Sequence, residues 1–148
     1  MRMVLQRVQK ARVEVSENTI AQIGAGLLLL VGITHDDTET DAKYLAEKCV
    51  NLRIFEDDAG KMNLSGLEVG AELLAISQFT LYADTRRGRR PSFVAAAPPE
   101  ESLPMFNKFV ELLKSLGLKV MTGEFGARMK VDFINDGPVT IILDSHFR

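Results

Sequence analysis

The stretch GLLLLVGITHDDTETDAKYLAEKCV, residues 26–50, contains the change in hydrophobic pattern that decides the fold class. Its first part, residues 26–33, is almost uniformly apolar, which is typical of a strand buried on both faces. Thr38 is suited to cap a helix, with Asp41 at the capping-box position three residues later. From there the apolar residues recur at helical spacing, at Ala42, Leu45, Ala46, Cys49 and Leu52. A buried strand followed by a helix predicts a mixed α/β domain.

Strand patterns surround this stretch on both sides. Short polar connections separate the first strands, which predicts antiparallel neighbours. A second helix begins at Pro99, followed by two glutamates, has Pro104 in or near its first turn, and ends at Gly117. Its expected apolar face is Leu103, Phe106, Phe109, Val110, Leu113 and Leu116. The expected strands are 3–9, 11–17, 19–24, 26–33, 72–83, 118–122, 130–135 and 139–144, with a polar loop over 56–70.

The expected architecture is one domain, residues 1–148. It is α/β, with a mixed, largely antiparallel, twisted or barrel-like sheet covered by two main helices. The composition, 46% hydrophobic and 26% charged, indicates a globular chain with enough apolar surface for a core. The longest apolar run, residues 24–33, is shorter than the ~20 residues that span a bilayer. We therefore expect a cytoplasmic protein with no membrane partner.

Charge and the rare residue types exclude several classes of site. A net charge of −2 argues against broad nucleic-acid binding and against a DNA partner, although it allows a local cationic patch. Cys49 is the one cysteine, so no intramolecular disulfide can form, and a small buried residue is a better interpretation than a nucleophile. His35 and His146, the two histidines, lie far apart in sequence. We expect no metal site.

Three segments contain more polar residues than a core requires, and the first is AISQFTLYAD, residues 75–84. Ser77, Gln78 and Thr80 there fit either a strand running out into a loop or a pocket of hydroxyls, an amide and main-chain N–H groups. A nucleophilic Ser77 or Thr80 would need an adjacent base, and no histidine or obvious lysine is near in sequence. Oxyanion stabilisation therefore fits these residues better than nucleophilic attack.

The second segment is TRRGRRPSF, residues 85–93, which contains the densest cationic cluster of the chain: Arg86, Arg87, Arg89 and Arg90. Such a run is commonly a solvated loop. Arginine forks also match phosphate oxygens, and Phe93 follows three residues later. A phosphate-bearing partner is therefore a second interpretation, in which neutralising Arg87 and Arg89 weakens binding and flattens its salt dependence.

The third segment is NDGPVT, residues 135–140, between two apolar runs. Asn, Asp and Gly favour a tight turn, and Pro138 fixes its own φ and removes a ladder donor. Since only about 5–6% of X-Pro bonds in folded proteins are cis, local rules predict a turn with a trans bond before Pro138. By itself the segment predicts a connection and no chemistry.

Taken together, SQFTL at 77–81 and NDGPVT at 135–140 closely resemble the two signature motifs of the D-aminoacyl-tRNA deacylase family. Further similar segments run through the whole chain: RVQKARVEV (7–15), NLRIFEDDAGKMNLS (51–65), RPSF (90–93) and FGARMKV (125–131). Each short motif is weak alone, but the two signatures in this order are specific. Neither signature departs from the family pattern.

The resemblance implies a homodimer that hydrolyses the ester joining a D-amino acid, or glycine, to the 3′-terminal ribose of tRNA. Its partner would be aminoacyl-tRNA, and it would need no metal or organic cofactor. In that family the Gly-Pro bond is cis and reaches across the dimer into the partner subunit's pocket. Transferred to this chain, the carbonyls of Gly137 and Pro138 would face the substrate's α-carbon, where an L side chain would collide with them.

The resemblance also implies roles for the SQFT segment. Ser77 and Gln78 would place the substrate, Phe79 and Thr80 would direct main-chain N–H groups at the ester, and Met129 would line the pocket. The family's threonine has been considered as a nucleophile, with the ribose 2′-OH of tRNA as the alternative proton-handling group. The lack of a base near Thr80 favours the 2′-OH.

Two other functions remain open at this point. A non-catalytic RNA-binding module would use the arginine loop and the sheet to bind tRNA without turnover. A related deacylase of the same fold would act on mischarged L-alanyl-tRNA. The loss of ester from D-tyrosyl-tRNA and from L-tyrosyl-tRNA discriminates between them.

Overall fold

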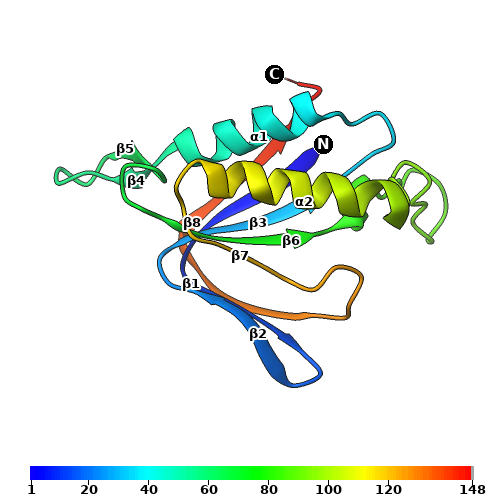
Figure 1. The fold of residues 1–148 in the computed structure, drawn as a ribbon, viewed down its shortest axis with the longest axis horizontal. Coiled ribbons are helices and arrows are strands. Elements are labelled where there is room, and N and C mark those ends of the chain that lie inside the picture. Colours follow the sequence, from blue (N-terminus) through cyan, green and yellow to red (C-terminus); the bar gives the residue numbers. More distant parts are fainter. Residues whose placement is uncertain (148) are drawn as a thin grey trace.

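The computed structural model describes residues 1–147, in which two helices lie against one face of a curved sheet (Figure 1). Within this range no helix has the length and apolar character needed to cross a membrane. The mixed α/β class is confirmed. In chain order the elements are β1 (Arg2–Val15), β2 (Asn18–Ile23), β3 (Gly26–Gly32), α1 (Glu39–Asn51), β4 (Arg53–Glu56), β5 (Met62–Ser65), β6 (Glu72–Ser77), the 3₁₀ helix η1 (Phe79–Tyr82), α2 (Pro99–Ser115), β7 (Val120–Thr122) and β8 (Lys130–Asp144).

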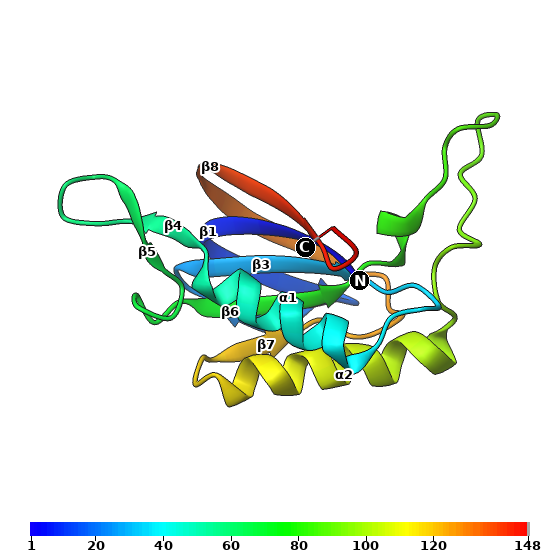
Figure 2. The ribbon, with the colours of Figure 1, turned by 90° about the horizontal axis from the view of Figure 1, so that it is seen from above.

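The main sheet has six strands and is mixed, as predicted. β1 pairs antiparallel with β2, β3 and β8, whereas β6 pairs parallel with both β3 and β7. β4 and β5 form a separate antiparallel hairpin. Because β8 follows β1 along most of its length, the sheet curls toward a barrel-like shape (Figures 1 and 2).

Both faces of β3 are buried, as its continuous apolar pattern predicts. Leu27, Leu29 and Val31 belong to the core that also contains the buried faces of α1 and α2. Leu28 belongs to a second core on the other side of the sheet, with Leu74 of β6. Met129, Val131 and Phe133, on and beside β8, pack against this second core.

The helix boundaries follow the predicted signals. The Asp41 carboxylate accepts hydrogen bonds from the Thr38 N–H at 2.9 Å and the Thr38 hydroxyl at 2.7 Å, completing the predicted cap of α1. Cys49 is fully buried in α1, and burial raises its pKa to about 12, so it is a core residue. Gly117 follows the end of α2 with a φ of +88°. Pro104 lies early in the second turn of α2, near the first turn as predicted, whereas Leu103 on the predicted apolar face is exposed.

Several predicted strand boundaries were wrong. Residues 3–17 contain one strand, β1, instead of two, because nothing between them forces a turn and an irregular register at Arg7 and Val8 absorbs the change of alternation. The predicted strand over 72–83 ends at Ser77 and continues as η1. The loop predicted over 56–70 contains β5.

The most informative difference concerns β8. The sequence predicts two strands joined by a turn, yet both halves pair antiparallel with β1, Asn135 opposite Val8 and Thr140 opposite Gln6. Residues 136–139 therefore lie opposite Arg7 alone. The segment is a large bulge in one continuous strand, and the chain does not reverse there.

Candidate active site

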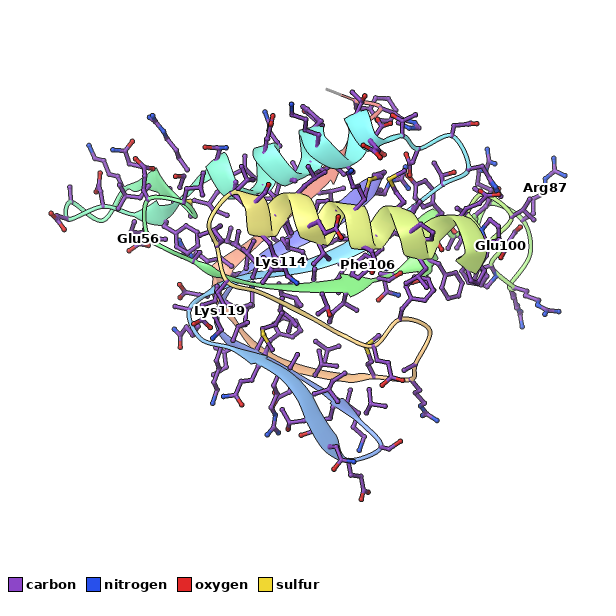
Figure 3. The ribbon with its side chains drawn as sticks, in the orientation of Figure 1. Glu56, Arg87, Glu100, Phe106, Lys114 and Lys119 are labelled. Atoms are coloured by element: carbon purple, nitrogen blue, oxygen red, sulfur yellow. The ribbon has the colours of Figure 1, made fainter. Side chains whose placement is uncertain are left out.

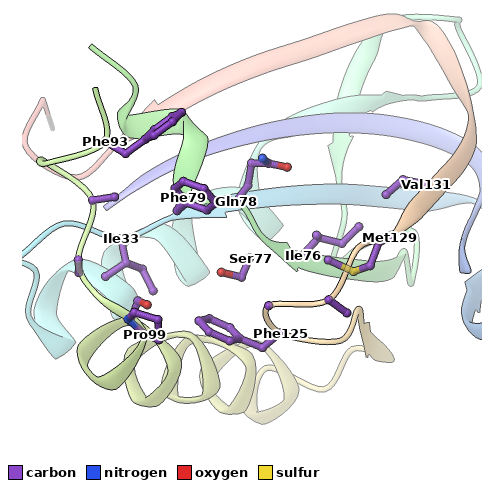
Figure 4. A pocket seen from close by; sticks show the side chains of 15 residues that line it. Ile33, Ile76, Ser77, Gln78, Phe79, Phe93, Pro99, Phe125, Met129 and Val131 are labelled. Carbon is purple, nitrogen blue, oxygen red and sulfur yellow. The ribbon is translucent and has the colours of Figure 1, made fainter. Parts of the chain in front are cut away.

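A cavity of about 520 Å³ lies where the parallel strands β3 and β6 end (Figure 4). Such strand ends are a common location for ligand sites in α/β sheets. The residues that line it are Ile33, Ile76, Ser77, Gln78, Phe79, Phe93, Ala96, Ala97, Pro99, Ser102, Phe125, Gly126, Ala127, Met129 and Val131. None of these lining residues is acidic, basic or histidine. The cavity is therefore an uncharged, largely apolar site with a few hydroxyl and amide groups.

The cavity borders the point where the chain leaves the sheet after Ser77. The Gln78 N–H donates a hydrogen bond to the Val31 carbonyl at 2.8 Å, and the chain then turns into η1. Gly32 permits this turn to pack closely on β3, because a β-carbon there would lie 3.1 Å from the Gln78 carbonyl oxygen and 3.0 Å from Leu81 Cβ. Main-chain bonding and a missing side chain thus position the SQFT segment.

Arg2 fastens η1 to the rest of the sheet. Its Nη1 donates to the Leu81 carbonyl at 3.0 Å, its Nε donates to the Asp144 carboxylate at 3.0 Å, and its guanidinium lies over the Tyr82 ring, 5.0 Å from the centroid. Burial raises the pKa of Tyr82 above its usual value, so this phenol stays neutral. η1 is therefore connected to both β1 and β8.

The predicted SQFT residues are brought together only in part. Ser77, Gln78 and Phe79 line the cavity, whereas Thr80 does not. The Gln78 side-chain amide donates a hydrogen bond to Thr80 Oγ1. Among residues 1–147, Thr80 Oγ1 makes no other hydrogen bond, and no base contacts it. The geometry therefore does not provide an activated Thr80 nucleophile.

Two main-chain donors follow Gln78, one on Phe79, which lines the cavity, and one on the adjacent Thr80. Phe79 and Thr80 are the first residues of η1, where N–H groups have no acceptor one turn earlier. Neither N–H donates to any other residue in the described part of the chain. These groups can donate to an external oxygen, which is the arrangement that oxyanion stabilisation requires.

Met129 lines the cavity as predicted, whereas Gly137 and Pro138 do not line the cavity of their own chain. The bulge that contains them lies beside β4, at the end of the molecule opposite the loop that precedes α2 (Figure 2). The Gly137–Pro138 bond is cis, as the resemblance implies, and the trans bond that local rules predict was wrong. Both residues are exposed.

Polar side chains hold this bulge on the sheet. Arg7, only 5% exposed, donates from Nη1 to the Ile54 carbonyl at 2.5 Å and from Nε to the Asp136 carbonyl at 3.3 Å. The Asn135 amide donates to the Val139 carbonyl at 3.0 Å across the bulge. Arg7 was not among the predicted site residues; its signal in the sequence is a charged residue at a position where the β1 alternation shifts.

The arginines lie on a projecting arm, residues 84–92, closed by two main-chain hydrogen bonds between Asp84 and Ser92. The Asp84 carboxylate accepts hydrogen bonds from the Arg86 N–H, Nε and Nη2, which lowers the pKa of Asp84 to about 2. All four arginines are exposed, and Arg87 points away from the body of the molecule (Figure 3). Among residues 1–147, no carboxylate pairs with the other three: Arg87, Arg89 and Arg90.

Sequence reasoning missed most of the apolar walls of the cavity. Phe93, noted only beside the arginines, places its ring edge-on against Phe79, with centroids 5.0 Å apart. Ile33, Pro99 and Phe125 come from three other segments. These contacts are long-range, and no local pattern carries a signal for them.

One cluster of potential metal ligands lies outside the cavity. Asp37, Asp41 and His146 bring potential ligand atoms within 4.8 Å of one another. The Asp37 carboxylate pairs with the Met1 amino group, and Asp41 caps α1, so both carboxylates have structural partners. Their structural roles account for the cluster.

The comparisons with known proteins agree along nearly the whole chain. A D-aminoacyl-tRNA deacylase of Thermosipho africanus is 56% identical over 145 residues, 98% of this chain and 97% of the relative. A Bacillus subtilis relative, 58% identical over 129 residues (87% of this chain and 98% of the relative), is named an inactive D-aminoacyl-tRNA deacylase. A solved structure named c-Myc DNA Unwinding Element Binding Protein has a TM-score of 0.91 at 40% identity, covering 97% of this chain and 98% of that one. The family model for D-Tyr-tRNA(Tyr) deacylase matches residues 4–144, and this chain belongs to that family.

Proposed function

We propose that this chain hydrolyses the ester between a D-amino acid and the 3′-terminal ribose of tRNA, releasing free D-amino acid and tRNA in the cytoplasm. Glycyl-tRNA, which has no side chain to reject, is a second substrate. The observation that carries the proposal is the uncharged cavity lined by Phe79, in a member of the deacylase family. Among residues 1–147 neither the Phe79 N–H nor that of the adjacent Thr80 has a hydrogen-bond acceptor.

The proposed chemistry relies on positioning. Ser77 and Gln78 orient the aminoacyl ester, water adds to its carbonyl carbon, and the N–H groups of Phe79 and Thr80 stabilise the oxyanion. Collapse breaks the bond to the ribose 3′-oxygen, which takes a proton as it leaves. With no titratable side chain lining the cavity, the neighbouring 2′-OH of the substrate is the group that moves the proton. No step requires a metal or a cofactor.

Selection against L-amino acids is proposed to come from a second subunit. The exposed Gly137 and Pro138 do not line the cavity of their own chain and follow Asp136, whose carbonyl accepts a hydrogen bond from buried Arg7, as a group presented to a partner subunit would. In a homodimer their carbonyl oxygens would line the partner's cavity beside the substrate's α-carbon. A D side chain points away from them, and an L side chain collides.

The arm is proposed to bind tRNA phosphates near the ester. Phe93, at the base of the arm, also lines the cavity, so the arm begins beside the cavity. Arg86 is neutralised by Asp84, which leaves Arg87, Arg89 and Arg90 for phosphate. Neutralising Arg87 and Arg89 should weaken tRNA binding and lower its salt slope by about 0.7 per lost single-strand contact.

The decisive experiment follows ester loss from D-tyrosyl-tRNA and L-tyrosyl-tRNA with purified protein. Loss of the D-ester alone supports the proposal. Salt-dependent tRNA binding without loss of either ester would indicate a binding module, an outcome that the Bacillus subtilis relative named inactive makes worth testing. Loss of ester from L-alanyl-tRNA but not from D-tyrosyl-tRNA would instead indicate the related alanyl specificity.

A further inference from the structure

The strap, which we define as residues 93–97, connects the arm to α2, and three of its residues line the cavity. A hydrogen bond from the Ala96 N–H to the Phe93 carbonyl, at 3.0 Å, closes a turn within it. The two carbonyls in the middle of this turn belong to Val94 and Ala95. Neither accepts a main-chain hydrogen bond from any residue in the range 1–147. Side chains must therefore fix the turn.

Thr34 and His35 provide the donors for these two carbonyls. Thr34 Oγ1 donates to the Ala95 carbonyl at 2.5 Å, and His35 Nε2 lies 3.1 Å from the Val94 carbonyl oxygen. Because a carbonyl oxygen only accepts, Nε2 carries a proton in this contact. The other ring nitrogen, Nδ1, lies 3.4 Å from the Glu101 carboxylate in the first turn of α2. His35 therefore joins the strap to α2 as well.

The segment that provides these donors is itself fixed, because it directly follows β3. The Ala97 N–H donates to the Ile33 carbonyl at 3.0 Å, and Thr34 pairs with Ala96 in an isolated antiparallel bridge. The Asp37 carboxylate accepts a hydrogen bond from the Thr34 N–H at 2.7 Å. Ile33 is buried and lines the cavity. The strap is thus fastened to the end of β3 at which the cavity lies.

The strap reaches the proposed oxyanion donors through one aromatic contact. The Phe93 ring packs edge-on against the Phe79 ring, with centroids 5.0 Å apart (Figure 4). Phe79 is 54% exposed and Phe93 is 38% exposed, so each ring depends on the other for much of its packing. A displacement of the strap would therefore be transmitted to Phe79, whose main-chain N–H is one of the two proposed donors.

We infer that Thr34 and His35 are positioning residues for the proposed hydrolysis. They hold the strap against β3 and α2, and the strap holds Phe93 against Phe79. This keeps the Phe79 N–H aligned with the oxyanion as it forms. Because the oxyanion exists only along the reaction path, the effect falls on kcat and not on KM. The inference rests on the proposed function, because it requires the Phe79 N–H to meet the oxyanion.

The test removes both side-chain donors. Thr34→Val/His35→Ala should lower kcat on D-tyrosyl-tRNA by about tenfold and leave KM within about twofold, because a misplaced group slows the reaction itself. Both hydrogen bonds are exposed, so water can replace the lost donors, and the Tm should stay within about 3 °C of the wild-type value. Thr19→Val, at an exposed position of β2, makes the same exchange of hydroxyl for methyl and is the matched control. It should change neither kcat nor Tm.

Two further comparisons separate positioning from general damage. Thr34→Ser keeps the hydroxyl donor and should retain kcat within about twofold, whereas Thr34→Val should lose about threefold. Phe93→Ala removes the ring through which the strap acts. In that background, adding Thr34→Val/His35→Ala should lower kcat by less than about twofold more, because effects that act through one shared contact do not add.

Four results would overturn the inference. They are a wild-type kcat in the folded Thr34→Val/His35→Ala variant, equal losses in Thr34→Ser and Thr34→Val, a full further loss in the Phe93→Ala background, and a double variant that does not fold. The last would give the two side chains a structural role only. These results require an active wild-type chain. A wild-type chain that hydrolyses no D-tyrosyl-tRNA overturns the proposed function, and this inference falls with it.

Discussion

The two segments that carry the family signature differ in their place in the sheet: residues 77–81 follow the end of β6, whereas residues 135–140 form a bulge within β8. They are also held in place by different interactions. The first is positioned by main-chain bonding from Gln78 and by the space at Gly32. The second is held by two side chains, Arg7 and Asn135. The first borders the cavity, and the second is exposed away from it. One chain therefore holds the two halves of the proposed site apart, and in the proposed homodimer a second chain would bring them together.

The strongest way to break this comparison is to damage the second segment alone. A β-carbon on Gly137 would lie 2.8 Å from Val139 Cγ2 and 2.9 Å from the Val139 nitrogen, at a φ of +130° that side chains rarely adopt. Gly137→Ala should lower D-tyrosyl-tRNA hydrolysis by about a hundredfold or more, since small misplacements in a site have effects of this size. Gly24→Ala is the control. Near-normal activity of a folded Gly137→Ala protein would contradict the proposed role of this segment.

Mixing two defective chains tests whether the halves come from different subunits. Ala127→Trp should block the cavity, and Gly137→Ala should damage the other segment. If each site combines residues of both subunits, random mixing should restore about a quarter of the wild-type activity per chain. About half of the dimers are then heterodimers, and each heterodimer has one intact site. Each variant refolded alone is the control. A mixture as inactive as its components would show that each site is built within one chain.

Arg7 tests whether side chains hold the second segment. Arg7→Met should leave the Ile54 and Asp136 carbonyls without their donor, which costs about 1–3 kcal/mol for buried groups. The Tm should fall by about 2–4 °C for each kcal/mol lost, with activity reduced about tenfold. Arg12→Met, on the same strand but half-exposed, should leave the Tm unchanged. Equal Tm losses in both variants would argue against a special role for Arg7.

The smallest expected effect is at Thr80. Thr80 does not line the cavity, and no base among residues 1–147 contacts its hydroxyl, so Thr80→Ala should retain activity within about threefold. The main-chain N–H of residue 80 survives the substitution. Single-turnover rates on D-tyrosyl-tRNA provide the measurement. Complete loss of hydrolysis, with folding and tRNA binding intact, would restore Thr80 as the nucleophile.

The sequence predicted those features that depend on local periodicity. The buried strand over 26–32, the cap at Thr38 and the glycine after α2 were all identified. The continuity of β8 was not, because it depends on pairing with β1 more than a hundred residues earlier. Local turn rules therefore gave the wrong structure for a segment whose conformation is set by Arg7 and Asn135.

The candidate site also contains residues that local motifs predict and residues that only the fold brings together. Ser77, Gln78, Phe79 and Met129 were identified by motif, and they line the cavity. Thr80 does not, because the strand predicted through residue 83 ends at Ser77 and turns away as η1. The walls formed by Ile33, Pro99 and Phe125 come from segments that only the fold brings together. No spacing rule along the chain predicts them.

The pairing of the first strand with the last has a consequence for synthesis. β1 emerges from the ribosome long before its partner β8, which begins only at Lys130. Until then β1 has an open edge, which is the kind of surface that invites aggregation. Contacts this distant in sequence also slow folding, since the loop between them must close first. The nascent chain therefore cannot assemble its sheet before the segment that carries Gly137 and Pro138 is made, and a truncated product would lack both the completed sheet and the proposed chirality filter.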